Sequence, residues 1–277
     1  MKANYEYCEA LVRERDRERF LAALFAPAKM RAHLFALYAF DLEIAHVPDA
    51  VHEPMAGEIR FQWWREAIGG ERAEEALANP VAAALLDTMA RCGLSADALV
   101  AAIDAKQFDL LGQSMESHEK LNTYLDATAG TIIAQAVRIL DSANEEDRAV
   151  RFAGRAIGLT RVLRSLAWDV SKGRLFIPLD LLAAHGVHTA SALAGENSGG
   201  LRATLVELYS AVGRELSSLR ATSLRVSSLP AFLPAALIPL YLTRMEKSDY
   251  DPFRSDPDVS RLRTQFALWR AARSGKI

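Results

Sequence analysis

Apolar residues recur at intervals of three and four along almost the whole chain, and this spacing limits the fold more than any other feature. Such intervals place side chains on one face of a helix. One stripe consists of Leu201, Leu205, Leu208, Val212, Leu216 and Leu219, and another of Val81, Leu85, Met89 and Cys92. No comparable alternating pattern indicates strands, and only the short piece 174–178 looks extended. The sequence predicts an all-α protein of about ten helices over roughly 14–271.

Helix ends are marked by residues that cap or interrupt helices. Asn79 followed by Pro80 predicts the beginning of a helix, and Gly93 followed by Ser95 predicts an end and a new beginning. A chain of 277 residues could form two domains at roughly 150 residues each. However, no linker rich in proline, glycine or serine divides it. We therefore expect residues 1–277 to form one domain, with a core over about 20–255.

Charge and cysteine content exclude several functional classes. Thirty-three basic against thirty-five acidic residues give a net charge of −2, which provides no overall attraction to nucleic acid or an anionic membrane. Any bound anion must be held by a local cluster.

Cys8 and Cys92 cannot form a disulfide framework, and they are expected to be free thiols in a reducing compartment. The first residues lack the apolar core of a signal peptide, and the apolar stretch 229–242 contains three prolines and is too short to span a bilayer. We expect a cytoplasmic protein with at most peripheral membrane contact.

Standard catalytic motifs are absent from the sequence. It contains no phosphate-binding loop, dinucleotide-binding fingerprint, nucleophile elbow or His-Glu-x-x-His zinc motif. His46, Asp49 and His52 are spaced by threes and could hold a metal, but Pro48 disturbs any helix there and disfavours that site.

The stretch 159–178 carries the strongest indication of function. On a helix, Leu159, Val162, Leu163 and Leu166 form an apolar stripe, and the opposite side presents Arg161, Ser165, Trp168 and Asp169. That polar side either faces solvent or lines a cavity. Composition alone favours solvent, because charged side chains on helices are usually exposed.

The same stretch resembles the second aspartate-rich motif of the squalene/phytoene synthase family, in which Leu-Thr, Leu-Arg, Asp, Gly-Arg and a final Pro recur in this order. Upstream segments resemble the family in colinear order over about 20–255: Phe35–Phe40, Trp64–Glu66, Ile103 with Asp104, Asp109 with Leu110, and Tyr124 with Gly130 and Thr131. The resemblance implies the all-helical isoprenoid synthase bundle around a central cavity.

The resemblance also implies a site in which two facing Asp-x-x-x-Asp pairs hold Mg²⁺ ions that ionise prenyl diphosphates. Here the first pair falls on Ala45 and Asp49, and the second on Ser165 and Asp169, so one carboxylate is missing from each. Since Mg²⁺ requires near-octahedral oxygen ligation, this loss argues against normal condensation. Asp49 and Asp169 are the candidate remnants of the catalytic metal site. We expect no cofactor, with Mg²⁺ bound only if prenyl transfer survives.

Further candidates for binding a substrate lie close to these motifs: Arg31, Tyr38, Asp104, Asp109, Arg164, Lys172 and Arg174. The basic side chains could bind a diphosphate or another anion without metal. Alternatively, Arg164 and Arg174 pair with carboxylates inside a polar cavity. We expect Asp49 and Asp169 to face each other across that cavity. Arg164 and at least one of Asp104 and Asp109 should be buried there with partners.

The reduced first motif, the segment Gln62–Arg65 and the Pro-containing segment Leu229–Leu237 resemble one branch of the family, which includes the mitochondrial complex I assembly factor. This similarity implies a non-catalytic binding or assembly protein, with a respiratory complex subunit or a prenyl-like lipid as partner and no nucleic acid. The alternative is a prenyl transferase of the squalene/phytoene synthase type with an altered metal site. An unrelated helical interaction protein is the third possibility.

Overall fold

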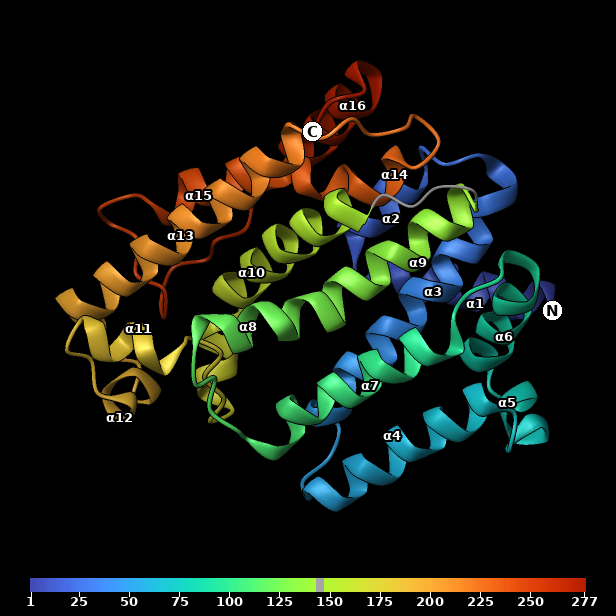
Figure 1. Ribbon diagram of the computed structural model, residues 1–277, viewed down its shortest axis with the longest axis horizontal. Helices are drawn as coiled ribbons and strands as arrows, with labels where there is room; N and C mark the ends of the chain where they lie inside the picture. Colours follow the sequence, from blue (N-terminus) through green and yellow to red (C-terminus); the bar gives the residue numbers. More distant parts are fainter. Residues whose placement is uncertain (143–146) are drawn as a thin grey trace.

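The computed structural model describes residues 1–142 and 147–277, and in these ranges the chain forms helices and no strands (Figure 1). The prediction of an all-α fold is confirmed. The piece 174–178, expected to be extended, is an irregular connection between two helices. Helices also begin earlier and are more numerous than predicted, because several connections contain short helical turns. None of the described helices is both long enough and apolar enough to cross a membrane.

The first half of the chain contains these elements: α1 (Lys2–Arg15), α2 (Arg17–Ala23), α3 (Ala28–His46), η1 (Val47–Asp49), α4 (Pro54–Gly69), α5 (Ala73–Ala78), α6 (Pro80–Cys92), α7 (Ala96–Leu111), α8 (His118–Leu125), η2 (Asp126–Gly130) and α9 (Thr131–Leu140). The second half contains α10 (Asp147–Ser171), α11 (Leu179–Ala184), α12 (Thr189–Leu193), α13 (Gly199–Arg220), α14 (Leu229–Phe232), η3 (Leu233–Leu237), α15 (Ile238–Met245) and α16 (Arg261–Ser274).

Helix ends follow the capping residues of the sequence. The Asn79 side chain accepts hydrogen bonds from the backbone N–H groups of Val81 and Ala82 at the beginning of α6, as predicted. Gly93 ends that helix with a φ of 67°, and Ser95 caps α7 by accepting from the N–H of Ala98. These short-range signals therefore fix where α6 and α7 meet.

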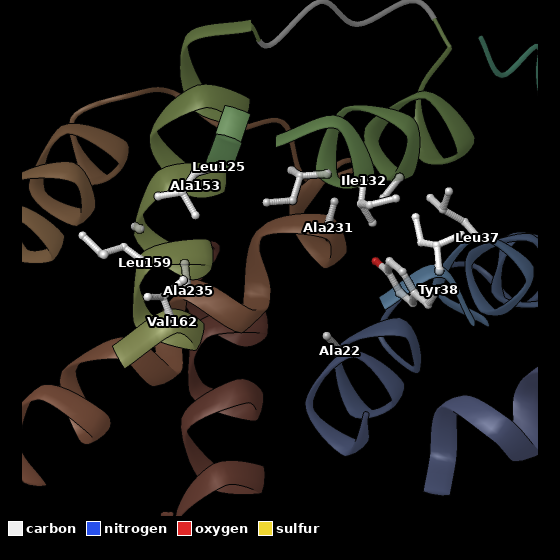
Figure 2. Close-up of a cluster of buried hydrophobic side chains, with 14 of the residues drawn as sticks. Ala22, Leu37, Tyr38, Leu125, Ile132, Ala153, Leu159, Val162, Ala231 and Ala235 are labelled. Carbon is white, nitrogen blue, oxygen red and sulfur yellow. The ribbon is translucent and has the colours of Figure 1, made fainter. Parts of the chain in front are cut away.

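Four central segments surround the interior of the bundle: α3, α7, the continuous α8–η2–α9 segment, and α10. Helix α4 packs along α7, and α13 packs along α10, on the outer sides of these segments (Figure 1). Helix α3 also contacts α1, α6 and α9. Side chains from α2, α3, α8, α9, α10, α14 and η3 point toward one another in the core, as Figure 2 shows for Ala22, Leu37, Tyr38, Leu125, Ile132, Ala153, Leu159, Val162, Ala231 and Ala235.

A π-helical turn, η2, allows α10 to approach the α8–η2–α9 segment very closely. A Cβ atom added at Gly154 of α10 would lie 2.6 Å from the Cα of Gly130 in η2. The two backbones can come this close because residue 154 has no side chain. This contact brings the polar face of α10 toward η2 and toward the site described below.

We expect Gly154→Ala to lower the free energy of unfolding by about 2 kcal/mol, because the new methyl group must push the two backbones apart. Gly213→Ala in α13 is the matched control, since a Cβ atom there meets nothing within 4 Å. That change should raise the free energy of unfolding by roughly 0.5 kcal/mol through the lower entropy of the unfolded chain. Urea denaturation of both variants measures the difference, and equal effects would contradict the close approach.

Candidate functional site

A cavity of about 270 Å³ lies between α3 with η1, α7, α8 with η2, α10 and the connection after α10. Four carboxylates line it: Asp41, Asp49, Asp109 and Asp169. They come from three segments of the chain, namely α3 with η1, α7 and α10, so the cavity is where these central helices converge. Asp49 and Asp169 do lie on facing walls of one polar cavity.

The side chain of Arg174 bridges Asp49 and Asp169. Its Nη2 atom lies 2.9 Å from Oδ1 of Asp49 and 3.1 Å from Oδ1 of Asp169. The guanidinium is largely buried, with 12% of the side chain exposed. A single cation therefore connects the two walls of the cavity.

Local turns place these three side chains. Helix α3 ends at His46, and Pro48 lies in the 3₁₀ turn η1, which carries Asp49. At the end of α10, Gly173 has a φ of 72° and reverses the chain, so that the N–H of Arg174 donates to the carbonyl of Asp169 over 2.8 Å. The Gly-Arg pair recognised in the sequence thus folds the arginine back over the last turns of α10.

Asp169 is held by a second donor on its own helix. Ser165, one turn earlier, donates from Oγ to Oδ2 of Asp169 over 2.6 Å. Burial raises the pKa of the Asp169 carboxyl above its usual range, while the Ser165 hydrogen bond and the charge of Arg174 lower it. The carboxylate therefore depends on these two partners to remain ionised.

A second cluster fills the α7 side of the cavity. The Lys106 ammonium lies 2.9 Å from Oδ2 of Asp109 and 2.7 Å from the Tyr124 hydroxyl, which itself donates to Oδ1 of Asp109 over 2.8 Å. Burial alone would lower the pKa of Lys106, but Asp109 and Tyr124 outweigh it and raise the pKa. Burial, followed by the Asp109 charge, raises the pKa of Tyr124. The ammonium and the phenol therefore both keep their protons.

A third cluster surrounds Asp41 on α3. Arg19 donates to Asp41 and to Asp16, in both cases over 2.6 Å, and Arg161 of α10 donates to Asp16 over 3.2 Å. Burial would raise the pKa of Asp16, but Arg19 and Arg161 outweigh it and lower the pKa. Every carboxylate that lines the cavity is thus paired with a basic side chain of the protein itself.

Trp168 lies at the rim of the cavity beside Asp49. Its indole Nε1 is 3.4 Å from Oδ2 of Asp49, and the Lys172 ammonium is 4.7 Å from the centre of the indole ring. Trp168 is about half exposed, with 53% of its surface accessible. The indole and the ion pairs together narrow access to the two carboxylates.

A smaller space lies next to the cavity on the side of Tyr38. A second space of about 20 Å³, bordered by Tyr38, Asp41 and Ile133, is large enough for one water molecule. The cavity itself, at about 270 Å³, lies just below the range of about 300–1000 Å³ typical of small-molecule sites. Neither space offers a long apolar channel.

Several candidates from the sequence lie elsewhere. Arg164 does not line the cavity, contrary to expectation, because it projects from α10 about 100° away from Ser165. It pairs with Glu18 at 2.9 Å and Asp258 at 2.8 Å, and it stacks on Tyr241.

Asp104 also lies outside the cavity, on an open groove, and pairs with Arg65 at 2.7 Å. Arg31 donates to the carbonyl of Ala26 over 2.9 Å, and Lys172 is exposed. Tyr38 is buried beside Arg19 and borders only the smaller space. Of the seven proposed binding residues, Asp109 and Arg174 are the two that line the cavity.

The sequence analysis did not name Lys106 or Asp41, and it placed Arg161 only on the polar face of 159–178, which does line the cavity. Asp41 had a visible signal, because it follows the fully apolar run 34–40 without a break in helical spacing. The sequence signal for Lys106 was weaker: it precedes Asp109 by three positions on the same helix face. The pairing of Arg161 with Asp16 had no local signal.

The magnesium site implied for Asp49 and Asp169 does not fit these side chains. Within 1–142 and 147–277, no three His, Cys, Asp or Glu side chains are grouped so that they could hold a metal ion. The space between Asp49 and Asp169 contains the Arg174 guanidinium instead. A fixed cation of the protein thus stands between the two carboxylates.

We expect Arg174→Gln to lower the free energy of unfolding by about 3 kcal/mol at neutral pH, because it leaves two facing carboxylates without a cation. The pKa of Asp169, already raised, should rise further, since Arg174 lowers it. A carboxyl with a raised folded pKa destabilises the protein above that pKa, and the penalty disappears as the pH falls through it. The destabilisation should therefore shrink in acid.

Urea denaturation over a pH series measures this effect. Lys120→Gln serves as the control, because its ion pair with Glu116 is exposed and should change stability by less than about 1 kcal/mol. The bridging role would be contradicted if Arg174→Gln lost no more free energy of unfolding than Lys120→Gln. It would also be contradicted if the loss for Arg174→Gln became larger in acid.

Curated proteins of similar sequence fall into two groups. The chain is 29% identical over 265 residues to the Bos taurus protein "NADH dehydrogenase (ubiquinone) complex I, assembly factor 6", covering 95% of this chain and 79% of the relative. The Homo sapiens protein of the same name is 27% identical over 95% of this chain and 79% of its own length. A phytoene synthase from Thermus thermophilus is 28% identical over 75% of this chain and 71% of the relative.

Solved structures agree on the fold. A dehydrosqualene synthase in complex with a ligand superposes with a TM-score of 0.82 over 99% of this chain and 96% of that one, at 18% identity. Squalene synthase HpnC from Alicyclobacillus acidocaldarius gives a TM-score of 0.69 over 99% and 94%, at 20% identity. The family model described as squalene/phytoene synthase matches residues 12–266. From this match and the shared bundle, we conclude that the chain belongs to the squalene/phytoene synthase family.

Proposed function

We propose that this chain is a non-catalytic assembly or binding protein built on the squalene/phytoene synthase fold, and that it acts in the assembly of respiratory complex I. The names of the mammalian relatives support this proposal, because the similarity to them extends over 79% of their length. The partner would be a subunit of that complex. Under this proposal the protein works without a magnesium cofactor.

The position of Arg174 is the observation on which the proposal rests. Ionising a diphosphate requires cations that approach its oxygen atoms and neutralise the charge as it develops. The Arg174 guanidinium is instead committed to Asp49 and Asp169, at 2.9 and 3.1 Å. Loss of one such electrostatic contact raises the activation barrier by about 3–4 kcal/mol. Here the loss would concern both of the metal clusters that the family resemblance implies.

The charges and volume of the cavity support the same proposal. The three cations that line it, Lys106, Arg161 and Arg174, all lie beside carboxylates. Little net positive charge is left to attract a diphosphate. The smaller space beyond the cavity, bordered by Tyr38, has room for about one water molecule and is too small for a prenyl chain.

Prenyl transfer with an altered site is the second candidate. It is favoured by the similarity to phytoene synthases and by the four carboxylates around one cavity. For this function the ion pairs of Arg174 would have to open to admit a metal and a diphosphate. The cost of separating a largely buried ion pair makes this the weaker candidate.

Deletion of the gene in its source organism tests the first candidate. We expect less assembled complex I on native gels and slower NADH oxidation by isolated membranes, both restored by returning the intact gene. Squalene and carotenoid content, measured in lipid extracts of the same cells, should stay unchanged. Normal complex I together with an altered isoprenoid profile would contradict the proposal and favour prenyl transfer.

An enzymatic assay tests the second candidate directly. The purified chain is incubated with radiolabelled farnesyl or geranylgeranyl diphosphate and Mg²⁺, with a phytoene synthase as positive control. We expect no release of diphosphate and no hydrocarbon product, because the carboxylates are already paired with Arg174. Turnover at a rate typical of enzymes, about 1 per second or faster, would overturn the non-catalytic proposal.

A further inference from the structure

Helix α16 (Arg261–Ser274) carries two apolar faces. The inner face, with Thr264, Leu268 and Ala271, is buried against the bundle. Leu262, Phe266 and Trp269 remain exposed, with 79%, 62% and 48% of their surfaces accessible. At about 100° per residue, these three side chains form a stripe on the opposite side of the helix. Because these three side chains stay exposed, packing within the described chain does not explain why the outer stripe is apolar.

The outer stripe is flanked by positive charge. Arg261 lies on one side of it, and Arg263 and Arg270 lie on the other. Arg273 lies within the stripe, 5.7 Å from the centre of the Trp269 ring, and Lys276 follows the helix. No Asp or Glu occurs in 261–277, and none of these five cations forms an ion pair with a described acidic residue. The basic cluster on α16 is thus available to an external anion.

The shape of this surface decides between two kinds of partner. A protein helix that docks through apolar side chains usually lies in a groove. Here the stripe is exposed on a helix, it borders none of the cavities and grooves described above, and α16 lies at the edge of the bundle (Figure 1). An exposed basic helix with Leu, Phe and Trp on one face is typical of segments that lie in a membrane interface.

We propose that α16 binds the surface of a membrane that contains anionic lipid. Leu262, Phe266 and Trp269 enter below the headgroups, and the flanking arginines lie at the level of the phosphates, with their aliphatic stems along the apolar region. The helix lies parallel to the surface and does not span the bilayer. This inference rests on α16 alone and is independent of the function proposed for the cavity.

Cosedimentation of the full chain with vesicles tests the charge requirement. We expect binding to vesicles of phosphatidylcholine mixed with phosphatidylglycerol, and little binding to phosphatidylcholine alone. Arg263→Glu with Arg270→Glu should lower the partition coefficient at least about tenfold, because each basic residue near the surface contributes roughly fivefold. Arg202→Glu with Arg214→Glu on α13 changes the net charge equally and should leave α16 binding nearly intact.

The apolar stripe is tested separately. Leu262→Gln, Phe266→Gln and Trp269→Gln combined should abolish binding, whereas Met55→Gln with Ile59→Gln, which alters exposed apolar residues on α4, should not. Circular dichroism and the thermal midpoint should match the unmodified chain, because all these side chains are exposed. The tryptophan emission should shift to shorter wavelength with anionic vesicles, and this shift should be lost in Trp269→Phe.

Three outcomes would overturn the proposal. The first is failure of the unmodified chain to bind anionic vesicles. The second is equal binding to neutral and anionic vesicles. The third is binding that the α16 variants and the α13 control reduce alike. An interaction of the stripe with an acidic protein surface would give the first outcome.

Discussion

Four carboxylates share one cavity of about 270 Å³, and their mutual repulsion is the problem that the surrounding structure has to solve. An isolated carboxylate loses several kcal/mol of hydration when it is buried, and a second like charge nearby adds to the cost. In this bundle each carboxylate meets a cation: Asp49 and Asp169 meet Arg174 from the connection after α10, Asp41 meets Arg19 of α2, and Asp109 meets Lys106 of its own helix α7. These pairs offset the repulsion that the convergence of the helices creates.

The ion pairs of Arg174 also bear on the function proposed for this chain. The bundle resembles solved squalene and dehydrosqualene synthases over nearly its whole length, yet the space between Asp49 and Asp169 contains an arginine side chain. A guanidinium is held by its own backbone and carries one charge, whereas a hydrated divalent ion can exchange ligands and follow a leaving group. Under the proposed function, the tethered Arg174 cation holds the two walls of the cavity together and no movable ion is needed.

Much of the fold could be predicted from the sequence because its determinants are local. The apolar stripe of α13 lies within 22 residues, and the Asn79 cap contacts residues two and three positions away. The candidate site was harder to predict from the sequence. Asp49 and Arg174 belong to segments far apart in the chain, and only their resemblance to two motifs brought them together.

The error for Arg164 has a simple physical origin. A shift of one position on a helix rotates a side chain by about 100°, so Ser165 lines the cavity while Arg164 reaches Glu18 and Asp258. Sequence spacing gives the angles between side chains within α10. It does not give the rotation of α10 relative to α2, which is set by packing contacts such as that of Gly154 with Gly130.

The distribution of charge pairs also changes where an anion can be recognised. The chain has a net charge of −2, and Arg164 and Arg174, two of the cations nearest the family motifs, are already paired with acidic side chains of the same chain. An anion at the cavity would have to compete with carboxylates fixed at hydrogen-bonding distance. The cations of α16 face no such competition, because their helix and the residues that follow it contain no acidic side chain. The basic cluster on α16 is therefore better placed to attract an anion than Arg174 and Lys106 in the cavity, where the family resemblance alone would have placed the anion.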